Sequence, residues 1–515
     1  MIQRYYDVVV LGTGLPGLLV GALVAKRGFR ALVLGQGHLP THYEAGGRRW
    51  PRRPHRFLSA QSPVAQRVLS EIALQPALRR RSTPVEPSFQ VILPHQRVDM
   101  TTEPAFLARE FDREFPTVKR ALEDFHAAVR REMGALDRAL SRSVVFPPET
   151  FFERRELARA IAGLRTDRHG HGPDLLGELS SEHPFREVVA TPAAFAVDVD
   201  PASLSRLGLL RAYGAWWLGA TQLEGGTPWL EDALVAKICA ANGEVRRDQR
   251  AESIALRRGR VEGVVLARAA ERIGCRHLID TGPAPALRAL LPERGTGLGE
   301  LLERLQEPVP KRVRYALHML LRPEAVPEGL AQDAFLVGEE AGEILGRLRL
   351  QLGPEGDEHE GEAVRRLSVE VLLPASLAGR DAAQLRGLRE RLLARLRVLL
   401  PFLDEHLVLL DSPHDGRDAY DPRAARELPA KDPWTRGPRT MEAQYAYAGS
   451  GALGVAGLPI RTPLRGLLLA GPHTAPGLGE EGAFLAAWGA ARLVVRSDRR
   501  RAFLRRPARF AKPAL

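Results

Sequence analysis

The sequence predicts an α/β protein in which a parallel sheet is joined to a mixed α+β unit that carries an antiparallel sheet. Residues 7–11 are expected to form a buried parallel strand, because Val8, Val9 and Val10 form an unbroken apolar run. A helical pattern follows to about Arg27 and residues 29–34 return as a strand, so the chain opens with a strand–helix–strand unit. An antiparallel sheet with one buried face is predicted by three segments in which apolar side chains recur with period two: 313–321, 347–352 and 367–373.

Composition excludes several classes of protein. The 44% hydrophobic and 26% charged content is typical of a globular protein. Cys239 and Cys275 lie far apart in the sequence, which argues against a disulfide framework or a zinc site and favours a reducing compartment. The paired histidines His169 and His171 lie in a glycine-containing loop without a cysteine, so we interpret them as part of a linker and expect no metal.

The charge and the N-terminus narrow the possible partners. The net charge of +12 comes mainly from arginines spread along the chain. No zinc-finger spacing or RNA-recognition signature accompanies them, so we expect no nucleic-acid partner. The first residues lack the pattern of a signal peptide, and arginine or glycine interrupts every long apolar run, which predicts a cytoplasmic protein.

A glycine pattern opens the first helix. Gly12-x-Gly14-x-x-Gly17 follows the buried strand, and its glycines allow a tight turn, close approach of a pyrophosphate and close packing of helix on strand. The helix N-terminus adds unpaired N–H groups and a positive dipole end. This context predicts a Rossmann-type dinucleotide-binding domain, with Leu15 and Pro16 beside the ligand.

Two further segments are candidates for the same ligand. Gly46-Gly47-Arg48 offers backbone N–H groups and a guanidinium to a diphosphate. Near the C-terminus, the apolar strand 466–470 runs into another glycine-rich turn and helix. We therefore expect the two ends of the chain to line one cleft. The candidate residues of the second turn are Gly471, Pro472, Gly477, Gly479, Gly482 and Ala483.

The second strand lacks the acid that a ribose site requires. A carboxylate is expected at its end, about twenty residues after the glycines. The sequence has Gly35 there, and the neighbouring Gln36 offers one weaker hydrogen bond. We expect weakened dinucleotide binding that Gly35→Glu would restore. Alternatively, glycine is required at this position for its backbone angles, and glutamate would strain the loop.

Taken together, these residues resemble the phytoene desaturase-type (carotenoid desaturase and isomerase) branch of the flavin amine-oxidase superfamily. The resemblance extends to Gly225-Gly226, to residues 260–264 and to Asp280-Thr281-Gly282-Pro283, and is most specific from Arg461 to Gly482. It implies FAD, an apolar substrate tunnel and redox chemistry on an isoprenoid polyene. It also places Ala251 at the adenosine end, Gly282 in the cofactor site and the last glycine block beside the flavin ring.

The resemblance implies a discontinuous FAD-binding domain and a substrate domain. We assign 1–100, 222–300 and 440–497 to the first, 101–221 and 301–439 to the second, and 498–515 to a basic tail. The tail suits either the inner face of an anionic membrane or simple solvation. Three aromatic residues either line the tunnel or form ordinary core: Tyr213, Trp216 and Trp217.

Two functions remain open at this point. One is an FAD-dependent oxidoreductase that desaturates, saturates or isomerises an apolar polyisoprenoid or related lipid, with catalytic residues that the sequence does not identify. The other is a catalytically silent relative that binds flavin weakly or not at all and acts as a binding or scaffold protein. The missing acid at Gly35 is compatible with both.

Overall fold

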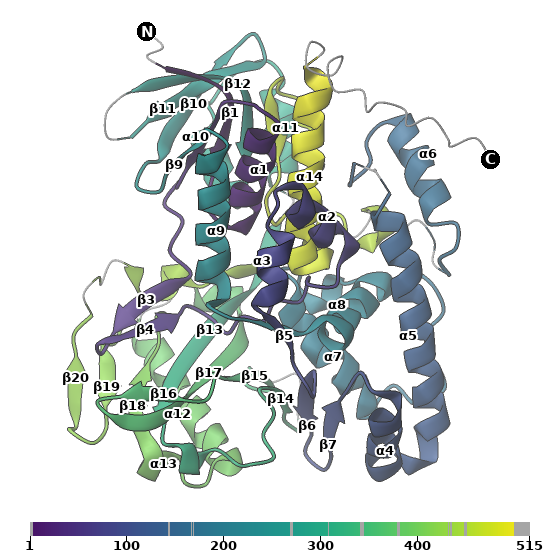
Figure 1. The fold of residues 1–515 in the computed structure, drawn as a ribbon, viewed down its shortest axis with the longest axis vertical. Helices are drawn as coiled ribbons and strands as arrows, with labels where there is room; N and C mark the ends of the chain where they lie inside the picture. The colour runs from purple at the N-terminus through teal and green to yellow at the C-terminus, as the bar shows by residue number, and fades with distance from the viewer. Residues whose placement is uncertain are drawn as a thin grey trace.

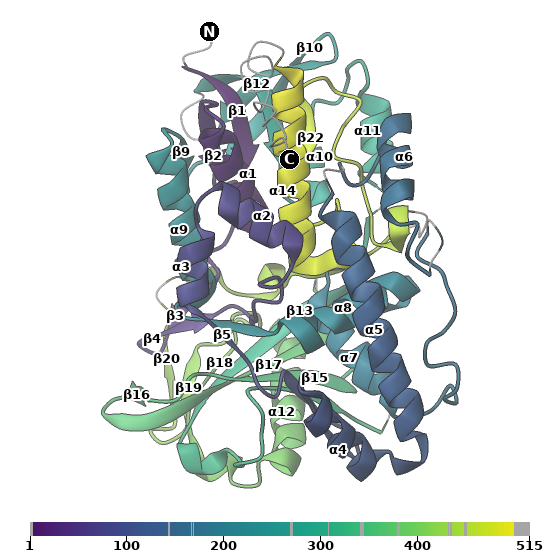
Figure 2. The same cartoon turned by 45° about the vertical axis from the view of Figure 1, so that its right-hand side comes forward.

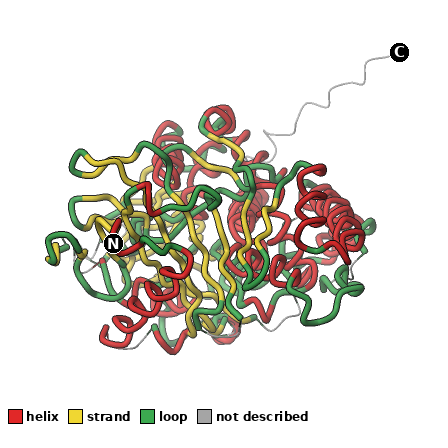
Figure 3. The backbone as a smooth tube through the Cα atoms, turned by 90° about the horizontal axis from the view of Figure 1, so that it is seen from below, coloured by secondary structure: helices red, strands yellow, loops and turns green. Residues whose placement is uncertain are grey.

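The computed structural model describes residues 4–498, except for short gaps, and divides into an upper and a lower unit in Figure 1. The gaps are 143–144, 166, 168, 268–270, 307, 340–343, 379–381, 431, 433–434 and 448–450, together with the side chains of 382–384 and 386. Strands occupy the middle of the molecule in the view from below, with helical segments around them (Figure 3). Within the described residues, no helix is both long enough and apolar enough to cross a bilayer.

The first unit is built on a seven-stranded sheet with the order β10-β11-β12-β1-β2-β9, to which β22 is added beside β12. Strand β1 is parallel to β2 and β12, and β12 is parallel to β22, so both ends of the chain enter one sheet. The strands are β1 (Arg4–Leu11), β2 (Ala31–Leu34), β9 (Glu244–Arg246), β10 (Ala251–Arg257), β11 (Arg260–Leu266), β12 (Arg272–Asp280) and β22 (Leu467–Leu469).

Helices cover both faces of this sheet, as a Rossmann-type fold requires. On one face, α1 (Leu15–Lys26) packs between α9 (Gly226–Ala240) and α14 (Gly479–Ser497), and Figure 2 shows α14 beside the N-terminal elements. The other face carries α10 (Ala284–Leu290) and α11 (Leu298–Arg304). The predicted α/β class is therefore confirmed, with α1 buried along most of its length.

The second unit contains an eleven-stranded sheet with the order β20-β19-β18-β13-β17-β15-β14-β6-β7, to which β16 and β21 are added. The three alternating segments of the sequence correspond to β13 (Val309–Leu321), β15 (Arg347–Leu352) and β17 (Glu362–Pro374), which pair antiparallel. The other strands are β6 (Phe89–Ile92), β7 (Arg97–Met100), β14 (Asp333–Val337), β16 (Asp357–His359), β18 (Leu407–Asp411), β19 (Ala419–Asp421), β20 (Arg426–Leu428) and β21 (Ala443–Ala446).

Both faces of this sheet are covered. The apolar face packs against α12 (Ala382–Leu399), whose Leu385, Leu388, Leu392 and Leu396 are buried. Part of the opposite face packs against α7 and α8. The other helices and short strands are β5 (Ser82–Pro84), α4 (Pro104–Glu114), α5 (Lys119–Leu140), α6 (Phe151–Ala160), α7 (Phe185–Ala196), α8 (Arg206–Gly219), β8 (Thr221–Leu223) and α13 (Leu403–His406). Of these, α6 lies beside the upper unit in Figure 1 and packs against the core of the first sheet.

Some segments that the sequence-based boundaries assign to the first unit belong to the sheet of the second unit. Strands β6 and β7 fall in the segment 1–100 that we assigned to the first unit, yet they form the end of the second sheet. Strand β21, in the segment 440–497, pairs with β13 of the second sheet. These short strands are not followed by a helix that would indicate their sheet from the sequence. Their sheet is therefore known only from the strands with which they pair.

Candidate cofactor site

The first glycine turn has the geometry of an anion-binding helix start. Helix α1 begins after Gly14, with no side chain capping its first turn and no acidic residue in it. A Cβ atom on Gly17 would lie 2.0 Å from the carbonyl oxygen of Gly12, so glycine is required for helix and strand to approach this closely. Free N–H groups and the helix dipole therefore face outward here, as a phosphate group requires.

Thr281 joins the two glycine-rich segments at the carboxyl edge of the sheet. Its hydroxyl donates to the carbonyl oxygen of Leu11 at 2.7 Å, and a Cβ atom on Gly12 would lie 2.6 Å from the same hydroxyl. On the other side, a Cβ atom on Gly471 would lie 2.9 Å from the carbonyl oxygen of Gly282. Segments 12–17 and 471–482 thus meet across 281–282, although most of the chain separates them.

The later glycines of the C-terminal block allow the backbone to pack closely on itself. A Cβ atom on Gly477 would lie 2.8 Å from Val455 Cα, and one on Gly482 would lie 2.3 Å from the carbonyl oxygen of Ala475. Gly479 has a φ of +53° and lies against the carbonyl of Ala196. Among the predicted residues at the two turns, those that are half-buried and remain accessible are Gly14, Leu15, Pro16, Pro472, Gly479 and Ala483.

Where the two segments meet lie buried polar atoms that have no hydrogen-bond partner within the described part of the chain. They are Asp280 Oδ2, His473 Nε2 and Thr474 Oγ1, all from buried residues. Burial raises the pKa of Asp280 to about 7 and lowers the pKa of His473 to about 4. We did not predict these three residues as part of the site from the sequence. Polar residues at the carboxyl ends of parallel strands often contact a ligand, so this pattern could have identified them.

At the adenosine end of the predicted site, the loop after β2 differs from the ribose-binding geometry that we expected. A Cβ atom on Gly35 would lie 1.8 Å from the carbonyl oxygen of Arg247, so the position admits no side chain. The carboxamide of Gln36 bonds to both backbone groups of Ala251, with Oε1 accepting from the N–H at 2.8 Å and Nε2 donating to the carbonyl at 3.0 Å. The expectation that Gly35→Glu restores a missing acid is therefore wrong, because the loop itself fills that space.

The prediction for Gly46-Gly47-Arg48 is also corrected. Gly46 and Gly47, with φ of +56° and +72°, form the two-residue turn between β3 (His42–Ala45) and β4 (Arg48–Pro51). The hairpin packs on the second sheet, where Arg48 pairs with Asp357. A Gly-Gly pair between two short strands itself predicts a hairpin. The arginine holds this hairpin against the second sheet through its ion pair and does not face a diphosphate site.

The aromatic residues of α8 belong to the core. Tyr213, Trp216 and Trp217 have 0% exposure, so none of them faces a cavity. They pack among a cluster of rings that includes Phe89, and Tyr213 shares a 2.7 Å hydrogen bond with His126 Nε2. Among the residues that the structure describes, no tunnel opens at this face of α8, and the alternative of ordinary core fits these side chains.

The opposite face of α8 borders a cavity of about 80 Å³ beside the C-terminal glycine block. This volume corresponds to a few water molecules. Arg211 from α8 bonds through its guanidinium to Glu481 at 2.6 and 2.8 Å and pairs with Asp137 at 2.7 Å. Residues that line the cavity are Leu58, Ser62, Ala215, Leu218, Gly477 and Glu480. The space next to the glycine block is therefore small and partly charged.

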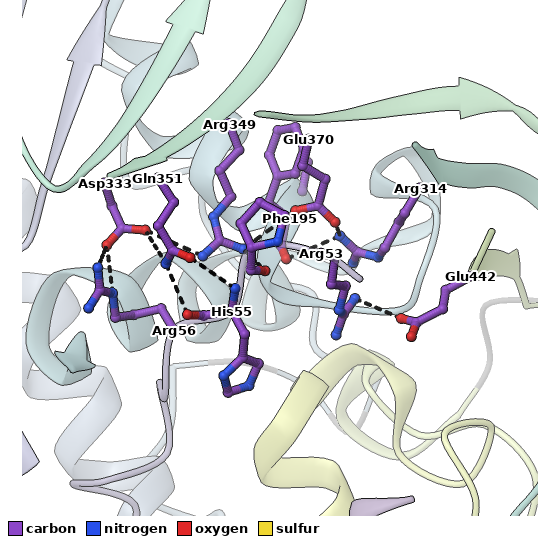
Figure 4. A network of polar contacts seen from close by, with 12 residues as sticks. Arg53, His55, Arg56, Phe195, Arg314, Asp333, Arg349, Gln351, Glu370 and Glu442 are labelled. Atoms are coloured by element: carbon purple, nitrogen blue, oxygen red, sulfur yellow. Dashed lines mark hydrogen bonds and ion pairs between the residues drawn. The ribbon is translucent and has the colours of Figure 1, made fainter. Parts of the chain in front are cut away.

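A network of charged side chains lies on the polar face of the second sheet (Figure 4). Arg349 contacts Asp333 at 3.3 Å and Glu370 at 3.4 Å, and Glu370 also accepts from Arg314 at 3.1 Å. These four residues are buried. Alternation in β13, β15 and β17 thus separates an apolar face from a charged face that is also covered, whereas the sequence predicted only one buried face.

The network continues toward the segment that precedes α2 (Pro63–Glu71). Arg53 pairs with Glu442 at 3.0 Å, and this pair is more accessible than the rest, with side chains 32% and 57% exposed. The Arg53 guanidinium lowers the pKa of Glu442 and keeps its carboxylate ionised. His55 contacts Glu480 at the start of α14, at 3.2 Å. Charged groups therefore extend from the second sheet to the C-terminal glycine block.

Comparison with known proteins agrees with the fold. No family model matches the sequence. A 4,4'-diapophytoene desaturase (4,4'-diapolycopene-forming) from Methylomonas sp is 22% identical over 293 residues, and the match spans 55% of each chain. A wild-type putrescine oxidase bound to putrescine superposes with a TM-score of 0.59 at 15% identity, covering 96% of this chain and 99% of that one.

Two further solved structures superpose over nearly the whole chain. An oxidoreductase from Methanosarcina mazei has a TM-score of 0.58 at 16% identity and covers 94% of this chain and 99% of its own. Cyclohexylamine oxidase from Brevibacterium oxydans has a TM-score of 0.55 at 14% identity and covers 96% and 99%. The chain thus has the fold of these oxidoreductases, and its partial similarity to a diapophytoene desaturase agrees with the resemblance found in the sequence.

Proposed function

We propose that the protein is an FAD-dependent oxidoreductase that desaturates, saturates or isomerises an apolar polyisoprenoid or related lipid. The observation that carries this proposal is the meeting of segments 12–17 and 471–482 across Thr281. A ligand that spans both segments would place a diphosphate at the turn of 12–17 and another chemical group at the turn of 471–482. The similarity to a diapophytoene desaturase supports lipid desaturation over other redox chemistry.

The residues present fit part of FAD and not all of it. The open start of α1 fits a diphosphate, and the unpartnered atoms of Asp280, His473 and Thr474 offer polar contacts nearby. The loop at Gly35 does not fit a carboxylate-bound ribose. When bound and oxidised, a flavin would accept two electrons and one proton as a hydride, and the second proton of a desaturated bond would leave to solvent.

The protein's own side chains would orient the substrate next to this site. Leu58, Ala215 and Leu218 give the cavity an apolar side, and the Arg211–Glu481 pair gives it a charged side. The accessible Arg53–Glu442 pair extends the charged surface. These walls favour a lipid that carries a polar group, and a chain of many carbons would require the cavity to widen.

A second candidate is supported by the loop after β2. Gln36 occupies the backbone groups of Ala251, and Gly35 leaves no room for an acid. Both features weaken dinucleotide binding, as a catalytically silent relative with a binding or scaffold role would show.

The membrane contact that the sequence predicts depends on residues 498–515, which lie outside the described residues apart from Asp498. Membrane association through this tail and an inner-face location remain proposals. Co-sedimentation with anionic liposomes, compared between the full chain and a chain ending at Asp498, tests them.

An anaerobic single turnover tests the enzyme proposal. Protein loaded with oxidised FAD is mixed with 4,4'-diapophytoene or with a polar-headed polyprenyl lipid, and flavin absorbance and product polyene are followed together. We expect flavin bleaching in proportion to new double bonds. Gly14→Val is the matched control, because a Cβ atom there meets only the flexible His38 side chain at 3.2 Å while obstructing the phosphate turn. Bound FAD with no flavin absorbance change and no change of the polyene spectrum, whether the flavin is loaded oxidised or reduced, would contradict the proposal and favour the silent relative.

A further inference from the structure

The loop that follows β2 is tied to the segment that leads into β10. The N–H of Gly35 donates to the carbonyl of Arg246 at 2.9 Å, and the N–H of Gln36 donates to the carbonyl of Gln249 at 3.1 Å. Gln36 has a φ of +54°, a conformation that L-residues seldom adopt. This backbone geometry directs its side chain to Ala251, the first residue of β10.

The carboxamide of Gln36 makes a matched pair of hydrogen bonds with one residue. Its oxygen accepts from the Ala251 N–H at 2.8 Å and its nitrogen donates to the Ala251 carbonyl at 3.0 Å. An adenine ring presents the same arrangement, since its N1 is an acceptor and the neighbouring 6-amino group is a donor. Ala251 therefore offers the backbone donor and acceptor that would recognise adenine, and Gln36 already holds both.

The position of the loop agrees with this comparison. The ring of His38, from the same loop, lies 3.2 Å from where a Cβ atom of Gly14 would be, so the loop also borders the phosphate turn. Gln36 is half-buried, and its two hydrogen bonds to Ala251 are only partly buried. One short loop thus contacts both the turn suited to a diphosphate and the backbone suited to adenine.

We propose that Gln36 is an internal occupant of the adenine subsite, so that an adenine nucleotide binds only after displacing its carboxamide from Ala251. This inference rests on the proposed function for the identity of the nucleotide. Adenine gains two hydrogen bonds at Ala251 while the protein loses two, so the base contributes little net affinity. Selectivity for FAD over a flavin without adenine is correspondingly small.

Shortening the side chain tests the inference. Gln36→Asn keeps a residue that tolerates positive φ but is too short to reach Ala251. Because two hydrogen bonds no longer have to be broken, we expect this variant to bind FAD and ADP about ten- to a hundred-fold more tightly. Binding of FMN, which has no adenine, is unchanged. Gln96→Asn, in the turn between β6 and β7, is the matched control and changes none of the three affinities.

The three probes separate the inference from the proposed function. Tighter binding of ADP and FAD with unchanged FMN supports the internal occupant, whether or not any flavin then turns over substrate. Unchanged or weaker binding of ADP and FAD by Gln36→Asn overturns it, and FAD turnover in the wild type would still support the enzyme. An equal gain for FMN also overturns it, because the effect would then not involve adenine. Fluorescence quenching measures the flavins, and calorimetry measures ADP.

Discussion

Gly35→Ala tests whether the protein's own loop excludes a side chain at the end of β2. The added Cβ atom would lie 1.8 Å from the carbonyl oxygen of Arg247, whereas ordinary contact begins at 3.4 Å. The difference, 3.4 − 1.8 = 1.6 Å, has to come from movement of backbone on one side or the other. Movement of that size breaks the hydrogen bonds between this loop and the segment 246–251.

The cost follows from those hydrogen bonds. Four of them join the loop to the segment: two from the backbone N–H groups of Gly35 and Gln36, and two from the Gln36 carboxamide. At about 1 kcal/mol each, their loss lowers the free energy of unfolding by about 4 kcal/mol. Urea-induced unfolding followed by circular dichroism measures the change. Gly35→Glu carries the same backbone conflict and is expected to destabilise at least as much.

Two other glycines serve as matched controls. Gly37 has a φ of +73° with open space around its Cβ position, so Gly37→Ala isolates the conformational cost of about 1–2 kcal/mol. Gly299 lies in α11 with open space around it, and Gly299→Ala is expected to stabilise by about 0.5–1 kcal/mol. If Gly35→Ala costs no more than Gly37→Ala, the steric argument is refuted and the acid could be restored after all.

Two further predictions concern the core. Burial lowers the pKa of His126 to about 4 and of His414 to about 3, so the unfolded chain binds more protons below a pH of about 6.5. Stability is therefore fully present above that pH and falls by about 2 kcal/mol per imidazole between about pH 7 and pH 5. Urea unfolding at the two pH values measures this loss, and a His126→Gln variant with an undiminished pH dependence would contradict it. Trp216→Ala should cost about 3–5 kcal/mol because the side chain is fully buried. Ala215→Leu, on the cavity face of the same helix, should change unfolding free energy by less than about 1.5 kcal/mol, and equal costs for the two variants would show that both faces are core.

Local sequence patterns predicted those elements whose conformation is determined by residues close to them in the sequence. The strand–helix–strand unit around Gly12 and the alternation in β13, β15 and β17 are both read within a few residues. Alternation shows which side chains share a face, but it carries no information on what covers that face. The burial of Arg349 and Glu370 depends on elements distant in sequence, so it could not be predicted.

In the candidate site, too, features set by nearby residues were predicted and features set by distant residues were not. The pairing of both glycine turns was predicted, because each turn needs the other to surround one ligand. The meaning of Gly35 was not, because it depends on the carbonyl of Arg247, more than two hundred residues away. A glycine in place of an acid has two interpretations in sequence, absence of a ligand contact or close approach of backbone, and only the structure distinguishes them. Arg48 was assigned to a diphosphate because it follows two glycines, and the sequence gives no sign that its partner is Asp357, which lies more than three hundred residues away.

Hydrogen–deuterium exchange with and without FAD tests the central claim, that both ends of the chain form one cofactor site. The claim rests on the contacts of Gly12 with Thr281 and of Gly471 with Gly282. At a saturating concentration of FAD, we predict slower exchange in peptides that cover 12–18 and in peptides that cover 471–483, with both effects reaching half their size at the same FAD concentration. Slower exchange in only one of the two segments, or in neither, would contradict the claim.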